Sequence, residues 1–295
     1  MSLLSPGVTV VETPVQLRTP TGSLWRGLWR HREGRIGLLL GGVLLLVAAF
    51  GPLLTADPNA TDYANQLQGP SGAHWLGTDR AGRDLVARTV AGAQASLGAA
   101  LLVMAISTAV GLLVGVIAGS AGGAVDAVLT RITDILLGLP GLVMTLALVG
   151  LLGPGFVNLV LAMSISSWAG LARLARAVAR SSGSRPDVLA ARMAGAGRIR
   201  IAVGHVLPAA AGQVLVAATL GLGEIVLALG GLSFLGLGAQ PPTAEWGNML
   251  ASARETLASA PHQLIGPGLG LVLTVLAATL VSDALRDVTD LGNRA

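Results

Sequence analysis

The chain has 295 residues and a formal net charge of +4, and 53% of its residues are hydrophobic whereas only 12% are charged. Soluble domains carry about 25% charged residues, so this composition indicates an integral membrane protein. The chain contains no Cys, which excludes disulfides and thiolate metal sites, and all 19 basic residues are Arg, so it has no Lys for a P-loop nucleotide site.

The first 35 residues precede the first apolar run and combine basic with aromatic side chains. The basic and aromatic residues are Arg18, Arg26, Arg30, Arg32, Arg35, Trp25 and Trp29. A cleavable signal peptide has a short basic segment and an apolar core of about 7 to 15 residues, and both segments are longer here. We therefore predict a cytoplasmic arm over residues 1–35 that leads into an uncleaved span, with the two Trp at the membrane interface.

Six segments are long and apolar enough to cross a membrane as helices. A span needs about 20 apolar residues to cross about 30 Å of hydrocarbon, where each backbone group must find its partner within the helix. The segments are residues 36–54, 97–119, 135–152, 157–174, 206–229 and 264–281. We therefore predict an all-α integral membrane domain of six transmembrane helices over residues 36–283, followed by a tail over residues 284–295.

The distribution of Arg predicts the orientation of these spans, because cytoplasmic connections are enriched in basic residues. The arm has five Arg against Glu12 and Glu33, and residues 173–200 have seven Arg against Asp187. Acidic and basic residues are balanced in the connections 55–96 and 233–263. We therefore expect both termini in the cytoplasm, outer loops at about 55–96 and 233–263, and a cytoplasmic loop at about 175–205.

Small residues recur at four-residue spacing in the first two spans. Gly111, Gly115 and Gly119 lie in the second span, and Gly37 and Gly41 lie in the first. This spacing lets helix backbones approach closely, so we interpret the glycines as packing positions.

The first outer loop contains two charge pairs at i and i+4, Asp79 with Arg83 and Arg80 with Asp84, at the start of an expected helix. Thr78 or Asp79 would cap this helix. Exposed pairs of this kind contribute only tenths of a kcal/mol, so their spacing alone fits a solvated helix face. In the second outer loop, Pro241-Pro242 and Trp246-Gly247-Asn248 predict an ordered turn.

A basic stripe ends the fourth span. Arg173, Arg176 and Arg180 fall within a narrow arc of a helix, because spacings of three and seven return to nearly the same face. The stripe would contact anionic headgroups or acidic groups of a cytoplasmic partner. Asp134, at the mouth of the third span, would face water.

A short helix with little side-chain bulk follows this stripe. Ala190, Ala191, Ala194 and Gly195 would share one side of it, and Gly195 and Gly197 would let the chain turn out of the helix. Pro208 would lie near the start of the fifth span, where a missing N–H costs little. Such a helix either lies at the membrane interface without a partner or inserts into a groove of one.

Glu224 is the clearest ionisable residue deep within a span. A charge near the bilayer centre costs at least about 2.5 to 3.5 kcal/mol on insertion scales, so such residues are usually functional. Glu224 would either line a transport pathway, where its carboxylate could meet a peptide's amino terminus, or form a structural hydrogen bond with a neighbouring helix.

Several stretches also resemble a known family. Ala190-Ala191, Gly195 and Leu207-Pro208 have the spacing of the EAA loop of ABC importer permeases, although Leu189 stands where that family usually has Glu. The stretches HWLGTDRAGRD (74–84), LSFLGLGAQPPTAEWGNML (232–250) and LTVLAATLVSDALRD (273–287) resemble the C-type permease of dipeptide and oligopeptide importers, a group that includes nickel importers.

The resemblance implies a type I ABC importer permease in the cytoplasmic (inner) membrane of a bacterium. The chain would be one half of a pore that imports dipeptides or oligopeptides by alternating access. Its partners would be a homologous B-type permease, one or two P-loop ATPases that bind ATP and Mg, and an extracytoplasmic peptide-binding protein. We expect no cofactor, metal ion or nucleic acid on this chain.

The resemblance also implies roles for two groups of residues. The coupling helix that contacts the ATPase would comprise Asp187, Ala190, Ala191, Arg192, Gly195 and Gly197. A gate at the outer mouth, or a contact with the binding protein, would comprise Thr78, Asp79, Arg80, Arg83 and Asp84.

Two other classes of function remain open from the sequence. A secondary transporter or channel would work without a motor, but such proteins usually place several ionisable groups at mid-membrane and often contain inverted repeats. A scaffold subunit without a transport path would tolerate substitution of Glu224.

Overall fold

The computed structural model describes residues 28–292, with side chains for residues 28–287, and every regular element in this part of the chain is a helix. Arg18, Trp25 and Arg26 of the expected N-terminal arm lie outside the described residues, as do the last three residues of the expected tail. The longer helices are α2 (Arg32–Leu54), α3 (Leu85–Ala121), α4 (Gly123–Leu137), α5 (Gly141–Leu152), α6 (Phe156–Ser182), α9 (Leu207–Phe234) and α11 (Ile265–Gly292). The shorter ones are α7 (Pro186–Met193), α8 (Arg198–Ile201) and α10 (Trp246–Arg254).

Five helical segments of the described chain are long and apolar enough to cross a membrane, and a bent pair of helices provides a sixth. The five segments are Arg32–Leu54, Leu85–Ala121, Phe156–Ser182, Arg198–Phe234 and Pro261–Asp287. The expected all-α, six-span class is therefore confirmed. Residues 85–96, which the sequence analysis assigned to an outer loop, belong to α3.

The third expected span is wrong as a single helix. Residues 135–152 are divided between α4 and α5, which meet at an angle of 90°. Pro140 causes the break, because proline lacks the N–H that a continuing helix needs and disfavours helical backbone at the residue before it, Leu139. The sequence analysis predicted this span from its apolar length and did not take the proline into account.

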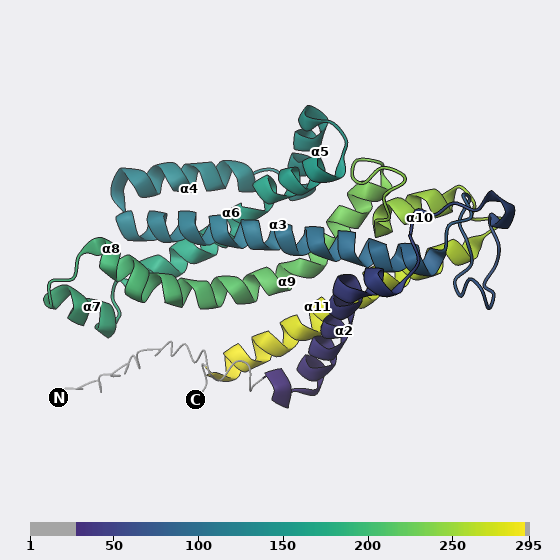
Figure 1. The fold of residues 1–295 in the computed structure, drawn as a ribbon. Coiled ribbons are helices and arrows are strands. Elements are labelled where there is room, and N and C mark those ends of the chain that lie inside the picture. The colour runs from purple at the N-terminus through teal and green to yellow at the C-terminus, as the bar shows by residue number, and fades with distance from the viewer. Residues whose placement is uncertain (1–27, 293–295) are drawn as a thin grey trace, which may run out of the picture.

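The two long helices α3 and α6 pack side by side, as Figure 1 shows, through the glycine positions of α3. A Cβ atom at Gly111 would lie 2.7 Å from Leu171 Cβ, and one at Gly119 would lie 2.5 Å from Ala179 Cβ. Any larger residue at these positions would push the helices apart. The interpretation of these glycines as packing positions is confirmed.

A second contact joins α2 to α11. A Cβ atom at Gly37 of α2 would lie 2.8 Å from the backbone nitrogen of Val281. Beside it, Leu28 packs against Ala284 and Leu285 in a buried cluster. The first and last described spans are therefore held together at one end, where Figure 1 shows the start of α2 beside the final turns of α11.

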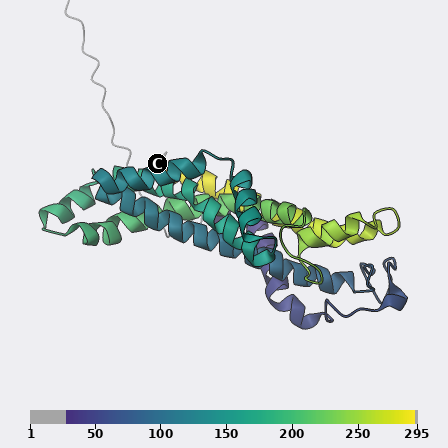
Figure 2. The ribbon, with the colours of Figure 1, turned by 90° about the horizontal axis from the view of Figure 1, so that it is seen from above.

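The molecule is elongated, and its shorter helices lie towards its two ends. Figures 1 and 2 show α7 and α8 at one end, and α10 with the connection between α2 and α3 at the other. We call these the α7 end and the α10 end.

A π-helix, η2 (Ala202–Val206), joins α8 to α9. The N–H of Leu207 donates to Ala202 O, five residues back. Pro208 follows immediately, and in a regular α-helix its ring would clash with the carbonyl of Gly204. The wider π turn provides room for the proline, so the chain stays helical through this position.

Candidate functional site

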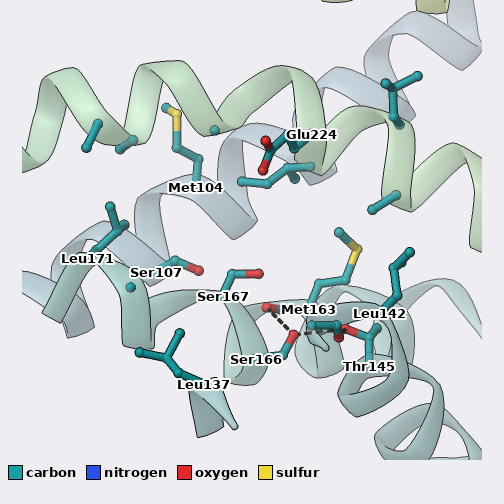
Figure 3. A pocket seen from close by; sticks show the side chains of 18 residues that line it. Met104, Ser107, Leu137, Leu142, Thr145, Met163, Ser166, Ser167, Leu171 and Glu224 are labelled. Carbon is teal, nitrogen blue, oxygen red and sulfur yellow. Dashed lines mark hydrogen bonds between the residues drawn. The ribbon is translucent and has the colours of Figure 1, made fainter. Parts of the chain in front are cut away.

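A cavity of about 720 Å³ lies between α3, α4, α5, α6 and α9 (Figure 3). Its volume falls within the range of about 300–1,000 Å³ that is typical of ligand pockets. The lining residues are Met104, Ser107, Leu137, Gly141, Leu142, Thr145, Met163, Ser166, Ser167, Gly170, Leu171, Ala217, Ala218, Gly221, Glu224, Ile225, Leu227 and Ala228. The wall is therefore largely apolar, with a few polar side chains.

Glu224 projects into this cavity from the middle of α9 (Figure 3). It is solvent-exposed, and it is the one formally charged side chain among the described residues that line the cavity. It has neither an ion pair nor a hydrogen bond to another described residue. The alternative of a structural hydrogen bond to a neighbouring helix is therefore absent from this conformation.

Hydroxyl groups supply the other polar atoms of the cavity. The hydroxyls of Thr145 on α5 and Ser166 on α6 lie 2.9 Å apart and form a hydrogen bond (Figure 3). Ser107 on α3 is only 1% exposed, and its hydroxyl has no hydrogen-bond partner. Sequence reasoning missed these residues, because single Ser and Thr on three different helices give no local pattern; the run Ser164-Ile165-Ser166-Ser167 was the only available signal.

The expected short helix is present as α7 at the α7 end. It begins at Pro186, and the chain leaves it through Gly195, whose φ of +81° favours glycine. Val188 is fully buried against Ile201 and Val206, which fixes α7 to the start of the α9 segment. Gly197 precedes α8 as its N-cap.

The outward side of α7 combines a patch of small residues with larger exposed side chains, among them Leu189. Ala190, Arg192 and Gly195 are exposed and Ala191 is half-buried. The large side chains of Met193 (89% exposed) and Ile199 (81% exposed) flank this small patch. Two large apolar side chains are therefore left uncovered close to α7.

Asp187 links α7 to its surroundings. The guanidinium of Arg185 donates hydrogen bonds of 3.0 and 2.9 Å to its two carboxylate oxygens, and His205 Nδ1 in the π-helix lies 3.5 Å from Oδ2. Burial by itself would raise the pKa of Asp187, but the hydrogen bonds and charge of Arg185 outweigh burial and lower it. Asp187 is therefore a carboxylate at neutral pH.

The basic stripe has partners within the same chain, which the sequence analysis did not foresee. Asp126 on α4 is only 4% exposed and accepts hydrogen bonds from Arg176 at 2.5 and 3.0 Å and from Arg180. Asp134 is exposed, as expected, and also forms an ion pair with Arg173 at 3.2 Å. The stripe thus fastens α6 to α4, so the expected pairing with headgroups or a partner protein is not needed to neutralise it.

At the α10 end, Thr78 and Asp79 are buried instead of lying on a solvated helix face. The carboxylate of Asp79 accepts hydrogen bonds from the backbone N–H groups of Ala81 and Arg83, at 2.8 and 3.0 Å. The expected Asp79–Arg83 pair is present at 2.7 Å, and Arg88 lies 3.3 Å from the same carboxylate. These contacts order the connection between α2 and α3.

Two other expectations for this segment are wrong. Arg80 pairs with Glu255 of the second connection, at 2.9 Å, and not with Asp84. Asp84 itself caps α3, which begins at Leu85, and its second oxygen lies 2.8 Å from His74 Nδ1. The helix begins later than its charge spacing suggested, because Gly82 with φ of +73° keeps residues 78–84 in a tight turn.

The turn expected in the second connection is present at Pro241-Pro242, but Trp246-Gly247-Asn248, which were expected in the same turn, form the start of α10. The residue that caps this helix is a buried carboxylate. Glu245 is 0% exposed and accepts hydrogen bonds from the Ser96 hydroxyl at 3.0 Å and from the N–H groups of Gly247 and Asn248 at 2.9 Å. Ser96 in turn accepts the N–H of Trp246 at 3.1 Å. Burial outweighs these donors and raises the pKa of Glu245.

Among the described residues, no group of three or more His, Asp or Glu side chains could hold a metal ion. The chemistry available at the cavity is therefore that of one carboxylate, hydroxyls, thioethers and apolar groups.

Comparison with known proteins gives two family matches. Residues 111–294 match the family described as binding-protein-dependent transport system inner membrane component. Residues 19–70 match the N-terminal transmembrane domain of oligopeptide transport permease C.

Individual relatives match over nearly their whole length. The nickel transport system permease protein NikC of Escherichia coli (strain K12) is 40% identical over 257 residues, which cover 87% of this chain and 93% of the relative. The glutathione transport system permease protein GsiD of Escherichia coli O6:K15:H31 (strain 536 / UPEC) is 39% identical over 279 residues, which cover 94% of this chain and 92% of the relative. GsiD of Shigella boydii serotype 4 (strain Sb227) matches equally well.

Proposed function

Since the chain belongs to the family of binding-protein-dependent transport system inner membrane components, and is an ABC importer permease of the nickel, glutathione and peptide type, we propose that its cargo is a dipeptide or oligopeptide. The observation that carries this proposal is the cavity with Glu224 on its wall. A largely apolar wall with one carboxylate suits a flexible molecule that has a cationic amino end and varied side chains.

The motor of this importer is a separate polypeptide. A P-loop ATPase holds the phosphates of ATP with the Lys of its GxxxxGK[ST] loop, and this chain has no Lys. ATP and Mg therefore bind to one or two partner ATPases. The remaining partners are a homologous B-type permease, which completes the pore, and a peptide-binding protein outside the membrane of the bacterium.

The α7 end faces the cytoplasm and receives the ATPase. The excess of Arg in residues 173–200 supports this orientation, because cytoplasmic connections are enriched in basic residues. Asp187, Ala190, Ala191, Arg192, Gly195 and Gly197 form the coupling site. The small side chains at 190, 191 and 195 allow α7 to enter a groove, and the flanking Met193 adds apolar contact area.

Movement of α7 reaches the cavity through α9. Val188 belongs to the same buried cluster as Val206 and Ala210, and Asp187 lies beside His205 of the π-helix, so a shift of α7 would be passed to the beginning of α9. Glu224 lies farther along the same helix. Closure of the ATPases would thus alternate the exposure of the cavity between the two sides of the membrane, with Thr78, Asp79, Arg80, Arg83 and Asp84 at the outer mouth.

A matched pair of tryptophan variants tests this assignment. Ala190→Trp adds bulk to the exposed face of α7 without the backbone strain that any side chain would meet at Gly195. Gly72→Trp adds the same bulk at the α10 end, where a Cβ would meet no atom within 4 Å. We expect affinity purification from native membranes, followed by mass spectrometry, to recover a second permease and an ATPase with the wild type and with Gly72→Trp, and to lose the ATPase with Ala190→Trp.

Recovery of the ATPase with Ala190→Trp at the wild-type ratio would contradict the coupling site. A wild-type chain that is purified alone and moves solute in vesicles without ATP would contradict the importer, and would favour a motor-independent transporter instead.

A further inference from the structure

The cavity wall offers negative charge and hydrogen-bond acceptors, but few free donors. The hydroxyls of Thr145 and Ser166 share a hydrogen bond, and their other acceptors are Gly141 O at 3.0 Å and Met163 O at 3.2 Å. Because each hydroxyl has a single hydrogen, and both hydrogens are used among these contacts, neither group has a hydrogen left for a ligand, and both present lone pairs. These two hydroxyls and the carboxylate of Glu224 would therefore bind a ligand group that has several hydrogen-bond donors.

A primary ammonium group has this chemistry. It carries three N–H donors, no acceptor and a positive charge, and its hydrogen bonds to a carboxylate are stronger than bonds between neutral groups. Glu224 lacks an ion-pair partner among the described residues, so a cationic ligand would form an ion pair with its carboxylate. A bare divalent cation fits less well, because the described cavity residues provide one carboxylate and no His.

Ser107 provides the missing donor. Other hydroxyls in these helices donate to a carbonyl of the preceding turn, as Ser164 does to Val160 O at 2.7 Å. The buried hydroxyl of Ser107 makes no such bond, although it lies on the cavity wall. Figure 3 shows it on the same side as Ser167, with Glu224 across the cavity. Its hydrogen therefore has no acceptor within the described protein, and it reaches an acceptor on a ligand, directly or through one water molecule, once the side chains that cover it at the cavity wall shift.

We propose that this wall is a binding site for the unmodified amino end of a short peptide. Glu224 binds the ammonium group, and Ser107, with Ser167 beside it, binds the first amide carbonyl. Met104 and Met163 border the site, and their flexible thioether side chains adapt to different first residues of the cargo. This inference rests on the function proposed above. It adds that the chain itself recognises the free amino end of the cargo.

The test compares peptides with free and blocked amino ends. The complete importer, purified with its partners and its binding protein, is reconstituted in vesicles that contain ATP or ADP. Uptake of dialanine and trialanine and of their N-acetyl forms is measured by mass spectrometry. The binding protein is the same in every sample, so its own preference for free or acetylated peptides does not differ between variants. A change in the ratio of free to acetylated uptake therefore measures the preference of the permease.

We expect Glu224→Gln to lower this ratio about tenfold by reducing uptake of the free forms, with acetylated uptake changed less than about twofold. Glu224→Asp should restore part of the ratio. Ser107→Ala should reduce both forms about threefold to tenfold and leave the ratio unchanged. Thr108→Val is the matched control, because the Thr108 hydroxyl is also buried without a partner but Thr108 does not line the cavity, and the substitution should change uptake of neither form.

The possible failures are distinguishable. Normal wild-type uptake together with an unchanged ratio in Glu224→Gln would overturn the ammonium site alone, provided that the variant still copurifies with its ATPase. Unchanged uptake in Ser107→Ala would overturn the carbonyl contact. A wild-type importer that hydrolyses ATP but takes up none of the four peptides would instead overturn the peptide cargo, and this site with it.

Discussion

Glu245 is an acid held in a fully buried position by three hydrogen-bond donors. Its carboxylate caps the start of α10, and Ser96 connects the same network to α3. Burial favours the neutral form and raises the pKa of Glu245 above its ordinary value of 4.5. A folded state that binds its proton more tightly than the unfolded state does is stabilised at low pH, and this contribution is lost as the pH rises through the folded-state pKa.

We therefore expect the melting temperature of the wild type in detergent to decline as the pH rises from about 4.5 towards neutrality, and Glu245→Gln to flatten this decline. The variant should also be less stable by about 1–3 kcal/mol, because the amide nitrogen that replaces one carboxyl oxygen cannot accept the N–H of Gly247 or Asn248. Thermal unfolding followed by tryptophan fluorescence measures both effects.

Glu255→Gln is the control, because Glu255 forms an exposed ion pair with Arg80 and should leave the pH profile unchanged. A wild-type slope that persists in Glu245→Gln would show that another group causes it.

The π-helix η2 is the element through which α7 and α9 meet. A π turn adds a residue to a helix and is frequent at functional sites. Here it accommodates Pro208 and brings His205 to within 3.5 Å of Asp187. Both side chains are partly exposed, so this contact contributes at most about 1 kcal/mol. Its loss should therefore affect the transmission of movement more than the assembly of the complex.

We expect His205→Ala to retain the ATPase subunit but to transport up to about fivefold less substrate for each ATP hydrolysed, the factor that corresponds to about 1 kcal/mol. His205→Gln should recover part of the loss, since its amide can still donate to Asp187. The measurement is the ratio of uptake to phosphate release in vesicles. A normal ratio in His205→Ala would place the coupling on Val188 and its apolar neighbours alone.

The sequence was sufficient to predict the spans other than the third, the glycine contacts of α3 and the position of α7. Each of these depends on a local pattern: apolar length, four-residue spacing or a run of small residues. Two errors are local, the break at Pro140 and the late start of α3 after Gly82, and the others concern interactions between distant parts of the chain. Nothing near Asp126 in the sequence indicates that it meets Arg176, which lies 50 residues later, and Arg80 pairs with a residue 175 positions away. The cavity was missed for the same reason: its lining residues come from five helices that are far apart in the sequence.

At the scale of the whole molecule, the two ends are built differently. At the α10 end, Arg88 donates to Pro58 O at 3.1 Å and to Pro242 O at 3.3 Å, so one guanidinium holds both long connections together. At the α7 end, Val188 and Asp187 are the main anchors of a helix whose other side is exposed. The α10 end is therefore internally connected, whereas the α7 end leaves exposed the side of α7 on which we propose that the ATPase binds.

The 90° break between α4 and α5 has a consequence for how the chain enters the bilayer during its synthesis. At 1.5 Å per residue, α4 is about 22 Å long and α5 about 18 Å, so neither helix can cross about 30 Å of hydrocarbon alone. The insertion machinery would meet two short segments, one of which contains Asp126 without the arginines that neutralise it.

We expect chains truncated after residue 153 to leave α4 and α5 outside the membrane or only partly inserted, and chains extended through residue 182 to insert them. Introduced glycosylation acceptors or protease protection of ribosome-bound chains would measure this. Stable insertion of the shorter chain would mean that the bend forms later, in a span that first crosses the bilayer straight. The topology of the third span is thus expected to be decided only when α6, with Arg176 and Arg180, has followed it out of the ribosome.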